Sequence, residues 1–361
     1  MIKKASLIRF ALAVSVLGAI SGCGQNTTQN NAAGTTGNTS SNGTIQSTGG
    51  STGNHTTSVR TAQTTNLSVL YAGSMTKVME QKIGPQADSA LGIHFQGEGK
   101  GSTALAQMMR SGLRTPDVFI SAAPSANNLL MGASNHNLVK WYLALAQDQL
   151  VIAYSPKSKF AGQLQQAAKG ALPWYKVMEE PGFRFGRTDP LLDPKGESTI
   201  FMFKLAETYY HQPDLFSQIL KSNENPSQVF PEESLLSQLT TGQVDAIIAY
   251  KHEAVEWNVP YITLPDAINL GNANDAAAYA KATITEKNGK VKHGTPILFT
   301  ITVPTNALHP SAGTAFARYL ISGPGHEILM KDGFTSIGAY FGGSKAAVPS
   351  SLQNLIQGQL K

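Results

Sequence analysis

The apolar residues between positions 67 and 125 occur in short runs, and each run is followed by small residues and then by helix-type spacing. These runs predict strands at 67–71, 93–96 and 118–121. The small-residue turns after them are Gly73-Ser74, 97–102 and 122–125. A repeated order of strand, turn and helix is typical of βαβ units, in which ligands bind at the carboxyl ends of the strands. The pattern therefore predicts an α/β fold.

A second alternation of strands and helices starts at residue 150. Its expected strands are 150–154, 185–187, 246–249, 261–264 and 296–303. We therefore predict two lobes, each a mostly parallel sheet flanked by helices, joined by two crossover strands. Lobe I is expected to comprise 66–146 plus 304–361, and lobe II 147–303. A cleft between two lobes is a natural ligand site, and the crossings are natural hinges.

Residues 1–23 have the pattern of a secretory signal. Basic Lys3, Lys4 and Arg9 precede an apolar run, 10–20, that is too short to form a stable transmembrane helix. The segment ends in Ile20-Ser21-Gly22-Cys23, which resembles a bacterial lipobox, where the cysteine receives a diacylglycerol and the chain is cut before it. We expect lipidation of Cys23, and the alternative is an ordinary signal peptide with an incidental cysteine.

Residues 24–65 consist almost entirely of Gly, Ser, Thr, Asn, Gln and Ala, with Arg60 as the only charge. Such a segment buries too little apolar surface to offset the entropy lost on ordering. We predict a disordered polar linker with a mean reach of about 35 Å, which holds a folded domain away from a membrane.

Composition excludes several classes of protein. A 361-residue chain with 41% hydrophobic residues can form a packed core, so it is not wholly disordered. One cysteine excludes an intrachain disulfide and a cysteine-rich metal site. Loss of the signal lowers the formal charge from +5 to about +2, and no basic stripe is interleaved with aromatic residues, so we expect no nucleic-acid binding.

Motifs of covalent chemistry are scarce. Ser74-Met75-Thr76-Lys77 matches the S-x-x-K pattern of penicillin-recognising enzymes, but their S-D-N and K-T-G companions are absent. Segment 97–102 fails the residue order of phosphate-binding loops. We expect a protein that is not an enzyme, and a surface serine hydrolase that uses Ser74 and Lys77 is the alternative from another class.

Three strand-to-helix turns carry a combination that binds anions, namely bare backbone N–H groups at a helix N-terminus beside a polar side chain. Gly73-Ser74 and Gly101-Ser102 belong to adjacent units of lobe I, and 193–196 belongs to lobe II. Each serine could also be an ordinary helix N-cap. Two such turns in one lobe favour the anion site.

Five longer blocks resemble the extracellular solute-binding proteins of molybdate/tungstate ABC transporters, above all the tungstate-type branch. The blocks are Val69–Thr76, Gly99–Ser102 with Thr115–Ser121, Gly186-Arg-Thr-Asp-Pro-Leu-Leu-Asp-Pro-Lys-Gly196, Asp245–Leu270, and Gly289–Pro304 with Phe316–Phe334. Together they span about 67–340, which is nearly the whole folded part.

The resemblance implies a type II periplasmic-binding-protein fold that captures a tetrahedral oxyanion, molybdate or tungstate, in the cleft between the lobes. It implies delivery to an ABC permease and its ATPase at the outer face of the cytoplasmic membrane, where the lipid anchor would hold the chain. We expect a monomer without a cofactor. Another small anion such as sulfate or phosphate is the alternative ligand, and a ferric-iron site ranks lower because the clustered Tyr and His of such a site are lacking.

For the site, the resemblance implies that Ser74, next to Gly73, and Ser102 donate hydroxyl and backbone N–H hydrogen bonds to the ligand. Lobe II would contribute the side chain of Asp193 and the amides that follow it, those of Lys195 and Gly196. Asp193 could instead only cap the following helix.

In the tungstate-type branch two carboxylates complete the shell around the metal centre of the oxyanion, and Asp193 matches one of them. The position of the other is Ala249 in this sequence. The second carboxylate is therefore missing, unless Glu253 or Glu197 takes its place.

Overall fold

The computed structural model describes residues 64–286 and 288–360. The expected signal, the expected lipidation site at Cys23 and all but the end of the 24–65 linker lie outside these residues. Within the described part of the chain, no helix is long and apolar enough to cross a bilayer.

The strands and helices are as follows. The strands are β1 (Thr65–Ala72), β2 (Ile93–Lys100), β3 (Val118–Ser121), β4 (Trp141–Gln147), β5 (Leu150–Tyr154), β6 (Phe185–Gly186), β7 (Ala246–Tyr250), β8 (Tyr261–Thr263), β9 (Thr283–Thr285), β10 (Val291–His293), β11 (Leu298–Thr302), β12 (Ala339–Gly343) and β13 (Ile356–Gln359). The helices are α1 (Thr76–Val78), α2 (Gly84–Leu91), α3 (Ser102–Arg110), α4 (Pro124–Asn128), α5 (Ala161–Ala168), α6 (Trp174–Met178), α7 (Pro194–Tyr209), α8 (Glu232–Thr241), α9 (Lys251–Glu256), α10 (Asp266–Asn269), α11 (Ala276–Tyr279), α12 (Pro310–Ser322), α13 (Pro324–Lys331) and α14 (Ser350–Gln353). A short 3-10 turn, η1 (Gly73–Met75), joins β1 to α1.

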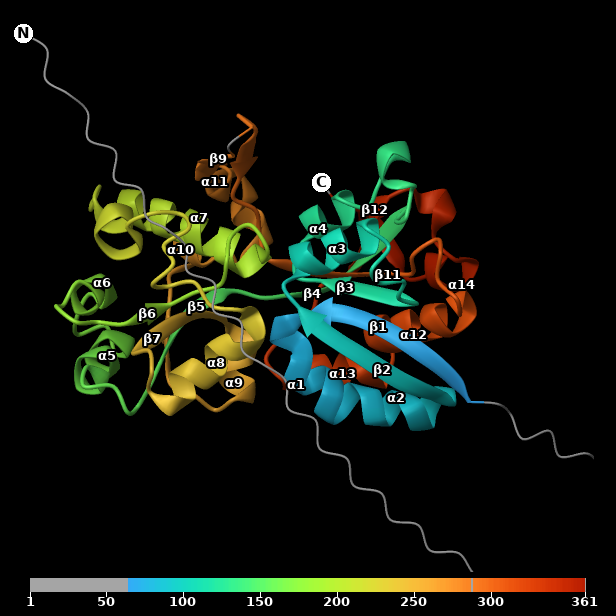
Figure 1. Cartoon of the computed structure of the whole chain (residues 1–361), viewed down its shortest axis with the longest axis horizontal. Helices are drawn as coiled ribbons and strands as arrows, with labels where there is room; N and C mark the ends of the chain where they lie inside the picture. Colours follow the sequence, from blue (N-terminus) through green and yellow to red (C-terminus); the bar gives the residue numbers. More distant parts are fainter. Residues whose placement is uncertain (1–63, 287, 361) are drawn as a thin grey trace, which may run out of the picture. The chain divides into compact units, whose positions relative to one another are not determined.

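Two main sheets organise the described residues. One has seven strands in the order β13-β12-β4-β11-β3-β1-β2, and the other has four in the order β6-β7-β5-β8. We call the parts built on them lobe I and lobe II, and Figure 1 shows them with their flanking helices. The predicted two-lobed α/β fold class is confirmed. The exact residue boundaries of the lobes stay predictions, although β11 pairs within the sheet of lobe I.

The expectation of mostly parallel sheets is corrected, because both sheets are mixed. In lobe I, β1 is parallel to β2 and β3, whereas β11 is antiparallel to β3 and β4. In lobe II, β5 is antiparallel to both of its neighbours, β7 and β8. The chain passes from β4 in the sheet of lobe I to β5 in the sheet of lobe II through Asp148 and Gln149 alone.

Each sheet is covered by helices on both faces. In lobe I, Leu70 and Phe119 pack with Leu105 of α3, whereas Val69 on the opposite face of β1 packs in the cluster that contains Phe316 of α12. Figure 1 shows α3 and α4 on one side of this sheet and α2, α12 and α13 on the other.

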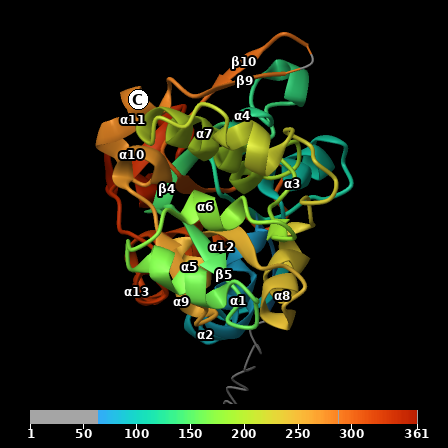
Figure 2. The same cartoon turned by 90° about the vertical axis from the view of Figure 1, so that its left-hand side faces the viewer.

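Lobe II repeats this arrangement. Val151 of β5 packs with Leu235 of α8, and Ile152 on the opposite face belongs to the cluster of α7. Figure 2 looks onto this lobe, with β5 behind α5 and α6. Alternation of the apolar residues in the strands therefore fixes which helix meets which face.

The turn predicted at 97–102 is shorter than expected. β2 continues to Lys100, which pairs with Ala72 at the end of β1. The chain then turns at Gly101 and enters α3 at Ser102. The two serine-bearing turns consequently start from the same end of two paired parallel strands.

Candidate functional site

The carboxyl ends of β1 and β2 carry two buried serines. Ser74 lies in η1, and its Oγ has no hydrogen-bond partner among the described residues. Ser102 is the first residue of α3, and its Oγ accepts a hydrogen bond from the Ala122 N–H at 3.0 Å. A hydroxyl that accepts still has its own hydrogen to donate. Both serines can therefore donate a hydrogen bond to a ligand.

Asp193 of lobe II is the N-cap of α7. Its Oδ1 accepts a hydrogen bond from the backbone N–H of Lys195 at 2.6 Å, so the helix-capping alternative is correct for this oxygen. Its Oδ2 is buried and has no partner within residues 64–286 and 288–360. One carboxylate thus supports the helix and presents a second oxygen to the site. Because this cap uses the Lys195 amide, that amide is not free for a ligand, contrary to the sequence-based expectation.

Gly196 has a packing role in the same turn. A Cβ at this position would lie 2.5 Å from the carbonyl oxygen of Thr188, which is closer than real Cβ contacts allow. Gly196 therefore lets α7 start directly against the backbone of residues 188–190. Its predicted contact with a ligand stays a prediction.

The Lys195 side chain is buried in an ion pair. Its Nζ lies 2.8 and 2.9 Å from the two carboxylate oxygens of Glu253 and 3.4 Å from Glu232 Oε1. Burial lowers the pKa of Lys195, but Glu253, Glu232 and Asp193 more than compensate and raise that pKa above its usual value. Lys195 is therefore a permanent positive charge, which offsets part of the negative charge around it.

Glu232, the first residue of α8, is the residue that sequence analysis missed. Burial, and next the neighbouring Asp193, raise the pKa of Glu232 well above its usual value. Glu232 Oε2 is buried without a partner in the described part of the chain. The Glu232 carboxyl group therefore favours its protonated form.

Tyr250 ends β7 and was also missed. It is fully buried, and its Oη has no hydrogen-bond partner among the residues with described positions. Burial, assisted by Asp193 and Glu232, raises the pKa of Tyr250 well above its usual value, so its hydroxyl keeps its hydrogen. A sequence signal existed, since Tyr250 stands at the carboxyl end of a predicted strand.

The turns of lobe I meet the carboxyl pair of lobe II. A Cβ on Gly73 would lie 2.7 Å from Glu232 Oε2, and a Cβ on Gly101 would lie 3.2 Å from Asp193 Oδ2. The Ala104 N–H also donates to the Leu192 carbonyl oxygen at 3.0 Å, which ties α3 to the start of α7. A cavity of about 310 Å³ opens beside this contact and is lined by Gly101, Thr188, Asp193 and Glu232. The predicted turns therefore come together at one place between the lobes.

Besides Asp193, the cavity is lined by a carboxyl group from α8, that of Glu232. Ala249 is buried against Leu235 and Leu236 of α8. Glu253 is held by Lys195 and by the Tyr250 N–H, and Glu197 is paired with Lys292 at 2.6 Å. Of Glu197, Glu232 and Glu253, it is Glu232 that lines the cavity with Asp193 and keeps a buried oxygen without a partner among the described residues.

The Ser74–Lys77 dyad of the hydrolase alternative is not formed. Lys77 Nζ donates to the backbone oxygen of Glu256 at 2.6 Å and lies 4.7 Å from the centroid of the Trp257 ring. Ser74 Oγ has no partner among the described residues, so no base is positioned to activate it.

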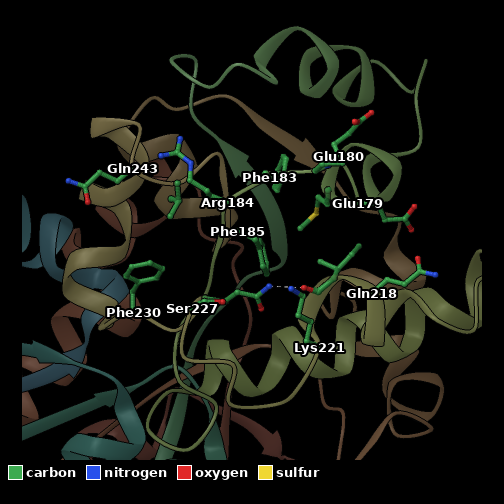
Figure 3. Close-up of a pocket in the computed structure, with 16 residues that line it drawn as sticks. Glu179, Glu180, Phe183, Arg184, Phe185, Gln218, Lys221, Ser227, Phe230 and Gln243 are labelled. Atoms are coloured by element: carbon green, nitrogen blue, oxygen red, sulfur yellow. Dashed lines mark hydrogen bonds between the residues drawn. The ribbon is translucent and has the colours of Figure 1, made fainter.

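A larger cavity of about 470 Å³ lies elsewhere, next to β6 in lobe II. Figure 3 shows Arg184 and Gln243 on one side of it and Glu179 and Gln218 on the other. Arg184 is already paired with Asp245 at 3.1 Å. None of the candidate ligand-binding residues, such as Ser74, Ser102, Asp193 and Glu232, lines this cavity. In the described residues, no group of three or more His, Cys, Asp or Glu side chains is arranged to hold a metal ion.

Fold and site together define a two-lobed ligand-binding protein whose candidate site lies where the lobes meet. The chain belongs to the family of bacterial extracellular solute-binding proteins, whose sequence profile matches residues 67–335. A Haloferax volcanii protein, provisionally named an ABC transporter molybdenum-binding protein, is 32% identical over 269 residues, which cover 74% of this chain and 81% of that protein. The molybdate/tungstate-binding protein WtpA of Pyrococcus abyssi is 28% identical over 323 residues, which cover 82% and 91% of the two chains.

A solved structure supports the fold. The periplasmic molybdate-binding protein of Azotobacter vinelandii superposes with a TM-score of 0.51 at 14% identity, over 75% of this chain and 99% of that one. At this identity the likeness concerns the fold alone. The family membership places this chain among the extracellular or periplasmic binding proteins of transport systems.

Proposed function

We propose that this protein captures a tetrahedral oxyanion, molybdate or tungstate, between its lobes and presents it to the permease and ATPase of an ABC importer. The proposal includes no covalent chemistry. The observation that carries it is the approach of the Gly73 and Gly101 turns of lobe I to Glu232 and Asp193 of lobe II. Four buried polar atoms on these elements and on the neighbouring β7 have no partner among the described residues: Ser74 Oγ, Asp193 Oδ2, Glu232 Oε2 and Tyr250 Oη. The names of the relatives from Haloferax and Pyrococcus support the choice of oxyanion.

An oxyanion would satisfy these atoms. A buried polar atom without a partner costs about 1–3 kcal/mol, so several together favour a bound ligand. The hydroxyls of Ser74, Ser102 and Tyr250 can donate to an oxyanion, and the N-terminus of α3 adds partial positive charge.

The carboxyl pair allows two modes of binding. In the first, Glu232 keeps its proton and donates it to an oxyanion oxygen. Alternatively, the proton leaves, and both carboxylates coordinate the molybdenum or tungsten centre. Sulfate and phosphate permit only the first mode, because sulfur and phosphorus stay four-coordinate in these ions. The number of protons released on binding therefore distinguishes the modes.

We also propose that the chain is exported, lipidated at Cys23 and held at the outer face of the cytoplasmic membrane by the 24–65 linker, and that it acts as a monomer. The lipobox-like segment supports the anchor. Metabolic labelling with a palmitate analogue should modify the full chain and leave Cys23→Ser unlabelled. Equal labelling of both would contradict the anchor without affecting the oxyanion proposal.

Isothermal titration calorimetry with molybdate, tungstate, sulfate and phosphate tests the ligand. We expect molybdate or tungstate to bind most tightly, and Ser74→Ala to weaken binding about tenfold or more through loss of a charge-assisted hydrogen bond. Ser125→Ala, at an exposed position of α4, is the matched control and should bind like the wild type. Repeating the titration in buffers with different heats of ionisation gives the number of protons released when the ligand binds.

Other outcomes are equally decisive. Absence of binding by all four anions contradicts the proposal, and preference for sulfate or phosphate establishes the alternative ligand. Covalent labelling of Ser74 by a fluorophosphonate probe would favour the hydrolase, and we expect none.

A further inference from the structure

His252 joins the two lobes at the ligand-binding turn. It lies in α9, fully buried. Its Nδ1 lies 2.5 Å from Asp148 Oδ2, and its Nε2 lies 3.2 Å from the backbone oxygen of Ser74. Asp148 is one of the two residues that connect β4 to β5. One imidazole ring therefore links the crossing between the lobes to the turn that carries Ser74.

The hydrogen-bond partners of the His252 ring indicate how many protons its two nitrogens carry. A carboxylate oxygen and a carbonyl oxygen can only accept hydrogen bonds, so both ring nitrogens must donate. The other oxygen of Asp148, Oδ1, accepts hydrogen bonds from the N–H groups of Gln149 at 2.7 Å and Lys251 at 3.1 Å. The ring thus faces hydrogen-bond acceptors on both sides, an arrangement that a doubly protonated imidazolium satisfies.

The ring is also held by packing. It stacks on Phe334 with 3.9 Å between the ring centroids, and Phe299 meets it edge-on at 5.6 Å. A Cβ on Gly333 would lie 3.2 Å from the Cα of His252, so the chain before Phe334 lies against α9 as well. These contacts prevent the ring from leaving its two hydrogen-bond partners.

Acidic groups surround His252 on several sides. Burial lowers its pKa, but Asp148 most of all, and then Glu253 and Glu256 on its own helix, raise that pKa above the usual value. Beyond Glu256 lie further charged groups of lobe I: Lys77, Lys82 and Asp332. Tyr250 stacks beside the ring and stays neutral because burial raises its pKa.

We propose that the imidazolium of His252 is a positioning residue for the ligand, held on the far side of the Ser74 turn. It fixes the Ser74 carbonyl and so aims the Ser74 hydroxyl, and it places a positive charge next to a site rich in carboxyl groups. A hydrogen bond to this carbonyl also polarises the peptide and strengthens the next N–H, that of Met75, as a donor. The ligand-binding role rests on the proposed function, whereas the protonation state of the ring does not.

The first experiment needs no ligand. The full chain is labelled with ¹⁵N-histidine, and the His252 signals are assigned by their loss in His252→Gln. We expect both ring nitrogens to carry protons at pH 7.5. A neutral ring with one unprotonated nitrogen would overturn the proposal, whether or not any oxyanion binds.

The second experiment measures affinity for the oxyanion that the wild type binds, from pH 6 to 9. We expect His252→Gln to weaken binding about tenfold, which corresponds to one charge-assisted hydrogen bond, and to remove the decline in affinity that accompanies loss of the ring proton. His309→Gln is the matched control, because His309 forms a comparable pair with Asp117 at 3.1 Å within lobe I. It should leave affinity and its pH profile unchanged.

The two experiments distinguish failure of the proposed function from failure of the role proposed for His252. If no oxyanion binds to the wild type, the proposed function fails and the NMR result still decides the charge of His252. If His252→Gln does not fold, the wild-type pH profile decides: affinity that stays constant through the pH at which the ring loses its proton contradicts the positioning role.

Discussion

Gly101 of lobe I packs against Asp193 of lobe II without room for a side chain between them. A Cβ on Gly101 would lie 2.5 Å from the Leu192 carbonyl oxygen and 3.2 Å from Asp193 Oδ2. The turn before α3 and the turn before α7 are therefore in backbone contact. Since the partner of Gly101 is a carbonyl group and not the end of a flexible side chain, this contact cannot adjust by a change of rotamer.

This contact predicts unequal effects for two glycine substitutions. We expect Gly101→Ala to weaken oxyanion binding tenfold or more, because the Leu192 backbone must move. Gly73→Ala should have a smaller effect, since its Cβ would meet the side chain of Glu232, which can shift more easily than a backbone carbonyl. Gly162→Ala in α5 is the control, as nothing lies within 4 Å of its Cβ position. Calorimetric affinities for the three variants test this order, and an equal loss for Gly73→Ala and Gly101→Ala would refute it.

Substitution of Ser74 and of Ser102 by alanine should change the free energy of unfolding differently. Ser74→Ala removes an oxygen without a described partner, so the free energy of unfolding without ligand should stay the same or rise. Ser102→Ala leaves the buried Ala122 N–H without its acceptor and should lower that free energy by about 1–2 kcal/mol. Urea denaturation of the ligand-free proteins measures both values. A loss of stability in Ser74→Ala would show that its hydroxyl already has a partner.

The sequence predicted the elements whose signal is local. β3 and β5 coincide with the expected strands because they are uninterrupted apolar runs with buried faces on both sides. The serine turns were found because they directly follow such strands. Glu232 could not be found in this way, since a carboxylate in the first turn of a helix is ordinarily explained by the helix dipole. Only the fold brings α8 to Asp193.

Lys195 illustrates the same limit. Its amide was expected to meet the ligand because it follows Asp193 at a helix start. The fold instead uses that amide for the Asp193 cap and directs the side chain toward Glu253. The pairing spans 58 residues in the chain, so no local pattern could indicate it.

The buried pair of Lys195 and Glu253 should be essential for stability. Lys195→Met leaves uncompensated buried carboxylates, and we expect the free energy of unfolding to fall by about 3–5 kcal/mol. The double variant Lys195→Met/Glu253→Gln should recover part of this loss because it also removes the unpaired negative charge of Glu253. Lys176→Met is the control, since its ion pair with Glu179 lies at the surface and should change stability by less than about 1 kcal/mol. A double variant that is less stable than the single one would argue against an electrostatic cause.

Glu256 should make the protein less stable as the pH rises from acid to neutral. Burial, opposed by His252 and reinforced by Asp332, raises the pKa of Glu256 to about 7 from 4.5. The folded protein therefore holds this proton more tightly than the unfolded chain does, and the resulting stabilisation is complete below pH 4.5 and lost as the pH passes 7. Glu256→Gln, which carries no charge at any pH, should make this decline smaller and leave the protein more stable than the wild type above pH 7. Glu180→Gln, at an exposed position in lobe II, should retain the decline. Unfolding free energies measured in urea between pH 4.5 and 8 test the difference, and parallel curves for the wild type and Glu256→Gln would exclude Glu256 as its source.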